Sequence, residues 1–91
     1  MEFTWSETKR AANINAHGLD FVDAASVFEG MTFTFEDDRF SYGEQRFVTL
    51  GLLAGITGSV IHKENEYEIR VISFRKATKR ESQIYFDEIQ N

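Results

Sequence analysis

Half of the chain's ten Lys and Arg residues fall between residues 70 and 80, where no Asp or Glu interrupts them. They are Arg70, Arg75, Lys76, Lys79 and Arg80. An arginine presents planar donors that match two oxygens of a phosphate, and its charge does not titrate away. We therefore predict that Arg70 and Arg75 bind phosphate, and that their three basic neighbours follow the backbone of a nucleic acid. The alternatives are ion pairs of both arginines with the acidic residues 36–38, and a solvated helix face for the other three.

Three further residues could help to break a phosphodiester without a metal, a reaction that needs a base, an acid and cationic groups. His17 is the acid–base candidate, because only imidazole titrates near neutral pH unaided. Its alternative is a helix-terminal histidine that hydrogen-bonds spare carbonyls. Glu44 and Arg46 lie two residues apart, so a strand would turn both side chains to one side. They form either a base with its electrostatic partner or a surface ion pair worth ~0–1 kcal/mol.

Two other residues could extend the same surface. Lys9, in the first expected helix, could contact an RNA backbone. Tyr85 could stack on a base, as aromatic side chains do with single-stranded RNA, or pack in the core under the last helix. The chain has no Cys, and its two His residues lack the spacing of metal ligands. We therefore expect neither a metal site nor a cofactor.

Length and composition predict one domain covering residues 1–91, with 42% apolar residues to build a single core. The net charge of −5 argues against nucleic-acid binding over the whole surface. A local basic patch remains possible, because charges more than ~10 Å apart are largely screened from one another. No apolar run reaches the ~18 residues of a membrane helix, and the first residues lack the pattern of a signal peptide. We expect a cytoplasmic protein that does not contact a membrane.

Hydrophobic periodicity predicts an α+β fold with the element order β-α-α-β-β-β-β-α. The expected helices are 7–16, 21–28 and 79–89, and the expected strands are 3–5, 31–35, 45–53, 59–62 and 67–74. Thr78 and Glu81 form a capping-box pattern at the start of the last helix. We expect two N-terminal helices packed on an antiparallel sheet, with a C-terminal helix closing the domain. The helices should cover one sheet face and leave the other partly open.

Several short motifs follow one another in an order that matches a single family. They are Phe3-x-Trp5 with Lys9 and Asn13; His17-Gly18-x-x-Phe21-x-x-Ala24-x-x-Val27-Phe28; Gly43-Glu44-x-Arg46; Gly51; and Ile69-Arg70-Val71-Ile72-Ser73-x-Arg75-Lys76-Ala77, followed by Glu81 and Tyr85. In this pattern the chain resembles the BrnT family of small bacterial ribonuclease toxins over nearly its whole length. The resemblance implies a RelE-like fold and a toxin of a type II toxin–antitoxin system. It also implies a ribbon-helix-helix antitoxin that neutralises the toxin and binds operator DNA. The toxin itself would contact operator DNA only indirectly, through this antitoxin.

Two functions are open at this point. The first is a metal-independent endoribonuclease that cleaves RNA by attack of the 2′-OH and leaves 2′,3′-cyclic phosphate ends. Its catalytic residues would be His17, Glu44 and the arginines named above. The second is a catalytically degenerate interaction module that binds an antitoxin-like partner without cleaving RNA. The acidic net charge favours the second function, as does Ala16 in place of the basic residue that usually precedes the His-Gly pair.

Overall fold

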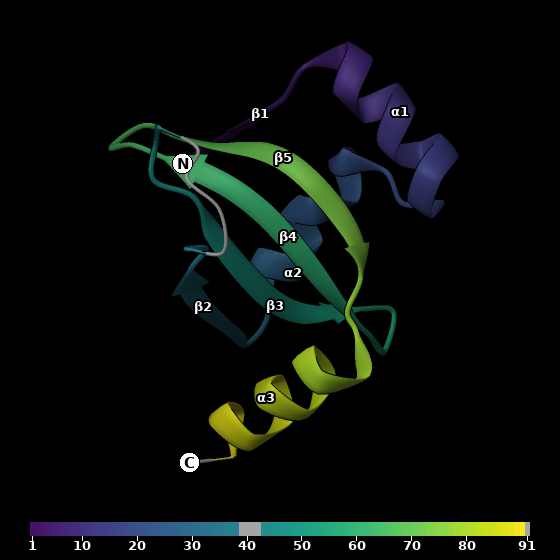
Figure 1. Cartoon of the computed structure of the whole chain (residues 1–91), viewed down its shortest axis with the longest axis vertical. Helices are drawn as coiled ribbons and strands as arrows, with labels where there is room; N and C mark the ends of the chain where they lie inside the picture. Colours follow the sequence, from purple (N-terminus) through teal and green to yellow (C-terminus); the bar gives the residue numbers. More distant parts are fainter. Residues whose placement is uncertain (39–42, 91) are drawn as a thin grey trace.

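A meander of four antiparallel strands forms the centre of the fold (Figure 1), in a computed structural model that describes residues 1–38 and 43–90. The strands are β2 (Thr32–Glu36), β3 (Phe47–Leu53), β4 (Ile56–Glu64) and β5 (Glu68–Lys76). A further strand, β1 (Glu2–Thr4), pairs in parallel with β5, which gives a five-stranded sheet in the order β1-β5-β4-β3-β2. The expected antiparallel sheet is therefore wrong at its first strand, and the sheet is mixed. Pairing direction depends on the path of the intervening chain, which the local residue pattern does not encode.

The helices begin and end at residues whose types predict those positions. The helical elements are α1 (Glu7–His17), the 3-10 turn η1 (Phe21–Asp23), α2 (Ala24–Glu29) and α3 (Lys79–Ile89). The Ser6 hydroxyl caps the start of α1, and Gly18 ends it in the left-handed conformation with φ 73°. Thr78 and Glu81 form the predicted capping box of α3. Within the described ranges, no helix is long and apolar enough to cross a membrane.

The helices pack on both faces of the sheet, and the expectation that they cover one face is wrong. One buried cluster joins η1 and α2 to β4 and β5: Phe21, Ala24, Val27, Val60, Val71 and Phe74. A second cluster joins Tyr85 of α3 to Val48 and Leu50 of β3. Val48 and Leu50 alternate with Thr49 along β3, so they point away from the side on which Thr49 contacts His62. The sheet is thus the middle layer, with α2 and α3 on opposite sides (Figure 1).

The buried side chain of Asn13 fixes α1 against the outer side of β5. Its Nδ2 donates to the Phe74 carbonyl at 2.7 Å and to the Leu19 carbonyl at 2.9 Å, and its Oδ1 accepts from the Phe74 N–H at 3.1 Å. The parallel pairing of β1 with β5 reaches only Arg70, so the Asn13 amide satisfies the β5 backbone beyond the end of β1. α1 therefore lies beside the C-terminal half of β5, past the point where the pairing with β1 ends.

A bulge in β5 decides which of its side chains share a face. The pairs Ile61–Ser73 and His62–Val71 leave Ile72 as an extra residue in β5. Arg70 and Arg75 are five residues apart, so in a regular strand they would point to opposite faces. Because of the extra residue, the side chains of Arg70 and Arg75 point to the same face of the sheet, which is the face on which α3 packs.

Candidate functional site

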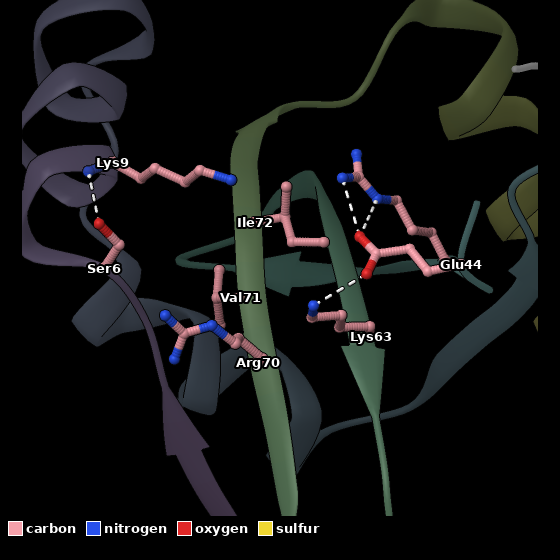
Figure 2. A pocket seen from close by; sticks show the side chains of 8 residues that line it. Ser6, Lys9, Glu44, Lys63, Arg70, Val71 and Ile72 are labelled. Carbon is pink, nitrogen blue, oxygen red and sulfur yellow. Dashed lines mark hydrogen bonds and ion pairs between the residues drawn. The ribbon is translucent and has the colours of Figure 1, made fainter. Parts of the chain in front are cut away.

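A small basic pocket lies between α1, the end of β4, the first half of β5 and the segment that precedes β3 (Figure 2). It has a volume of ≈60 Å³. Its lining residues are Ser6, Lys9, Glu44, Arg46, Lys63, Arg70, Val71 and Ile72. Among the described residues these supply four cations and one carboxylate, so the pocket carries a formal charge of +3 on a chain of net charge −5.

Three parts of the fold bring these charges together. Lys63 and Arg70 are direct cross-strand partners of β4 and β5 and their side chains share one face. Arg46 and Glu44 lie in the coil immediately before β3 rather than in the expected strand, and their side chains contact each other there. Lys9 projects from the first turn of α1, where its N–H also donates to the Ser6 cap. Of the residues that the sequence analysis named, Lys9, Glu44, Arg46 and Arg70 line this pocket.

Glu44 is the anionic centre of the pocket. Its Oε1 accepts from Nε and Nη2 of Arg46 at 3.2 and 3.0 Å, and its Oε2 accepts from Nζ of Lys63 at 2.9 Å. These contacts are drawn as dashed lines in Figure 2. The hydrogen bond from Lys63, followed by those from Arg46, holds the pKa of Glu44 below its ordinary value. A carboxylate with a low pKa is ionised at neutral pH but is a weak general base.

Arg70 reaches from the pocket to β1. Its Nη1 lies 3.5 Å from the Thr4 hydroxyl, which donates to Oε2 of Glu68 at 2.6 Å. Within the described residues, Arg70 does not form the alternative ion pair with residues 36–38. In the described part of the chain its guanidinium makes one long hydrogen bond, and it lines the pocket, so it can bind an anionic ligand.

Arg75 lies on the same face but outside the pocket, because it is paired with α3. Its Nη1 and Nη2 donate to the two carboxylate oxygens of Glu81 at 2.8 and 3.0 Å. The exposed fractions of the two side chains are only 22% and 14%. Burial raises the pKa of Glu81, but the hydrogen bonds from Arg75 and from the Thr78 N–H outweigh it, so the pKa lies below its ordinary value. Arg75 thus joins the end of β5 to the first turn of α3, and its partner is not the acidic segment that we considered.

His17 is exposed at the far end of α1 and does not line the basic pocket. It follows Lys9 by eight residues, which places it ~12 Å further along the helix axis. There it lines an apolar hollow of ≈320 Å³ that also includes Leu53, Phe74 and Lys76. The other histidine, His62, is buried and 1% exposed. The predicted pairing of an imidazole with Glu44 at one centre is therefore not formed.

Tyr85 and the basic residues at the start of α3 complete the set of predicted residues. Tyr85 is 1% exposed and its hydroxyl donates to the Met31 carbonyl at 2.9 Å, so the prediction of base stacking is wrong and the core alternative holds. Lys79 and Arg80 are exposed on the first turn of α3. They do not line the basic pocket.

Lys63 is the functional candidate that the sequence analysis missed. The expected strands 59–62 and 67–74 leave Lys63 in the turn between them, whereas β4 continues to Glu64 and pairs Lys63 with Arg70. Two cations at facing positions of neighbouring strands repel each other, so they mark a surface that can attract an anion. In the described part of the chain, no group of three or more His, Cys, Asp or Glu residues could hold a metal ion.

One protein-family model matches the chain over residues 5–81, and its description is "Ribonuclease toxin, BrnT, of type II toxin-antitoxin system". All eight lining residues of the basic pocket lie inside the matched range. A search of curated proteins gives no significant match.

Proposed function

Because the chain belongs to the BrnT family of ribonuclease toxins of type II toxin–antitoxin systems, we propose that it is a metal-independent endoribonuclease that binds RNA beside α1. The observation that carries this proposal is the +3 pocket on a chain of net charge −5. Local positive charge on an otherwise acidic surface concentrates a polyanion at one place. The family supplies the reaction class, and the pocket supplies a place for the phosphodiester.

A row of neighbouring hollows gives the RNA strand a path. A hollow of ≈310 Å³ shares Lys9 and Ile72 with the basic pocket, and it shares His17 with the apolar hollow at the end of α1. The path therefore follows α1 from its first turn to its last. Lys9 and Lys76 would contact the backbone along it, and the apolar hollow has room for a base.

The reaction we propose is attack of the ribose 2′-OH on the adjacent phosphorus. The bond to the 5′-oxygen of the next nucleotide breaks, and the products carry a 2′,3′-cyclic phosphate and a 5′-OH. Lys63, Arg46 and Arg70 would stabilise the negative charge that develops on the phosphorane. Glu44, whose pKa is lowered, is better suited to holding these cations in place than to removing the 2′-OH proton.

A type II system implies a protein antitoxin, and we propose one of the ribbon-helix-helix class. Such a partner would neutralise the toxin and contact operator DNA itself, so that the toxin reaches DNA only through the complex. The fifteen Asp and Glu residues give the toxin a charge suited to a basic partner. Because its substrate would be cellular RNA, we place the protein in the cytoplasm.

The test is RNA cleavage by the purified chain, free of its partner, in excess EDTA. The variants Arg70→Ala and Lys63→Ala remove one cation each from the pocket. Lys79→Ala is the matched control, because it removes an exposed cation elsewhere. We expect fragments with cyclic phosphate ends from the native chain and from the control, and at least ~10-fold slower cleavage by the pocket variants, as for the loss of one charge-stabilising donor. Equal cleavage by all four proteins would place the site elsewhere.

A second function, an interaction module that does not cleave RNA, is favoured by one specific observation. Neither histidine reaches the basic pocket, since His17 lies at the other end of α1 and His62 is buried. Among the described residues, the pocket is therefore lined by cations and one carboxylate but by no imidazole. Absence of cleavage by a folded native chain, together with RNA or antitoxin binding, would establish this second function.

A further inference from the structure

We propose that the basic pocket is a site for one phosphate group and that Glu44 occupies the place of this phosphate while the pocket is empty. Glu44 would then be an internal competitor of the ligand. Its removal should tighten phosphate binding, which is the opposite of what loss of a binding or base residue would do. The inference rests on the proposed function only in taking RNA as the natural source of the phosphate.

The contacts of Glu44 are those that a phosphate would make. One carboxylate oxygen takes two donors of the Arg46 fork, and the other takes the Lys63 ammonium. Arginine and lysine bind phosphate oxygens through the same donors and at the same range of distances. The pocket thus already presents two of its cations in a geometry that suits an anion with two or more oxygens.

The size and charge of the pocket limit the ligand. A volume of ≈60 Å³ is far below the ~300–1,000 Å³ of small-molecule sites, so the pocket has room for one anionic group and not for a whole nucleotide. Lys9 and Arg70 line the pocket without contacting Glu44. A phosphate would therefore meet two cations that the carboxylate does not reach, as well as the two that it does.

Displacement of Glu44 is feasible because its own side chain and that of Lys63 are exposed, while Arg46 is half-buried. The Glu44 side chain is 36% exposed, and those of Lys63 and Arg46 are 42% and 20% exposed. Pairs at this exposure are weak, because water screens them and solvates the separated groups. Glu44 lies in the coil before β3, so rotation of its side chain alone could move the carboxylate into solvent while β3 keeps its pairing.

The magnitude follows from the repulsion that the carboxylate exerts on an incoming phosphate. Two unit charges ~5 Å apart in a water-like medium repel enough to change a dissociation constant about fourfold. Glu44→Gln keeps the shape of the side chain and removes its charge. We therefore expect the Glu44→Gln variant to bind phosphate groups at least about fourfold more tightly than the native chain.

The experiment measures binding and cleavage separately. The binding probes are a fluorescent 2′-O-methyl oligoribonucleotide, which has no free 2′-OH to attack, and inorganic phosphate as its competitor. Glu29→Gln is the matched control, because it makes the same change in net charge at an exposed residue at the end of α2, outside the pocket. Lys63→Ala should weaken binding of both probes. Thermal unfolding of every variant verifies that it is folded.

Tighter binding of both probes by Glu44→Gln, with Glu29→Gln unchanged, supports the proposal. Unchanged or weaker binding by Glu44→Gln overturns it, and loss of cleavage with unchanged binding would identify Glu44 as the general base instead. Tighter binding of inorganic phosphate alone, with no oligonucleotide bound, would support a phosphate site and refute RNA as its ligand. The experiment can therefore refute the proposed role of Glu44 without refuting the proposed function, and the reverse.

Discussion

Burial of His62 should make the folded chain lose stability as the pH falls below the ordinary pKa of histidine. The imidazole is 1% exposed and lies against the rings of Phe28 and Phe47, with centroids 5.3 and 6.0 Å away. Its Nε2 shares a hydrogen bond of 2.7 Å with the Thr49 hydroxyl, and its Nδ1 has no hydrogen-bond partner among the residues that the structure describes. Burial lowers the pKa of His62 from 6.5 to about 4.

The sign and size of the effect follow from linkage. Above pH 6.5, the pKa of this histidine in the unfolded chain, His62 is neutral in both the folded and the unfolded state. In that range its titration does not change the free energy of unfolding. Between pH 6.5 and about 4 the unfolded chain binds a proton that the folded chain excludes, so stability falls. Between about pH 8 and about pH 5 the loss is about 2 kcal/mol, a large part of the ~5–15 kcal/mol typical of a domain.

Urea unfolding at these two pH values measures the loss directly. The loss should be about 2 kcal/mol smaller in His62→Gln than in the native chain, because glutamine cannot titrate. His17→Gln, which changes the exposed histidine, should show the native loss. Equal losses in all three proteins would refute the reasoning. They would mean that the folded chain protonates His62, with the Glu64 carboxylate, 3.6 Å from Nδ1, stabilising the imidazolium.

Three further predictions concern contacts that position the site. Arg75→Ala should lower the free energy of unfolding by about 2 kcal/mol through loss of two charge-assisted hydrogen bonds to Glu81. It should leave oligonucleotide binding unchanged, as measured by fluorescence anisotropy, and weaker binding would place Arg75 at the RNA. Asn13→Ala should cost about 3 kcal/mol in urea unfolding, because the N–H and C=O of Phe74 lose their partner. Gly58→Ala should cost about 2 kcal/mol in the same assay, since its Cβ would lie 2.9 Å from the buried Phe74 ring, and a neutral effect would show that the ring can move.

Local structure was predicted well wherever neighbouring residues decide it. The Ser6 cap, the Gly18 terminus and the capping box of Thr78 and Glu81 all lie where the sequence placed them. Each depends on a side chain and a backbone group within three or four residues, so the sequence contains the whole interaction. The second expected helix was predicted less well, because it is divided into η1 and α2.

The membership of the candidate site was predicted only in part. Glu44 and Arg46 are in contact, but they lie in the coil before β3 and not in the strand from which their alternation was argued. Alternation would have separated Arg70 from Arg75, and the bulge at Ile72 places both on one face. Arg75 is nevertheless absent from the pocket, because α3 brings the Glu81 carboxylate to it.

The sequence by itself determined the family, the α+β class, the helix ends and the concentration of positive charge in residues 70–80. Only the tertiary structure decided that β1 pairs in parallel, that α3 covers the second sheet face, and that Lys63 joins the pocket while His17 lies outside it. The first group depends on contacts between near neighbours in the chain. The second depends on pairing register and helix packing, which bring together residues far apart in sequence and are fixed by the whole core.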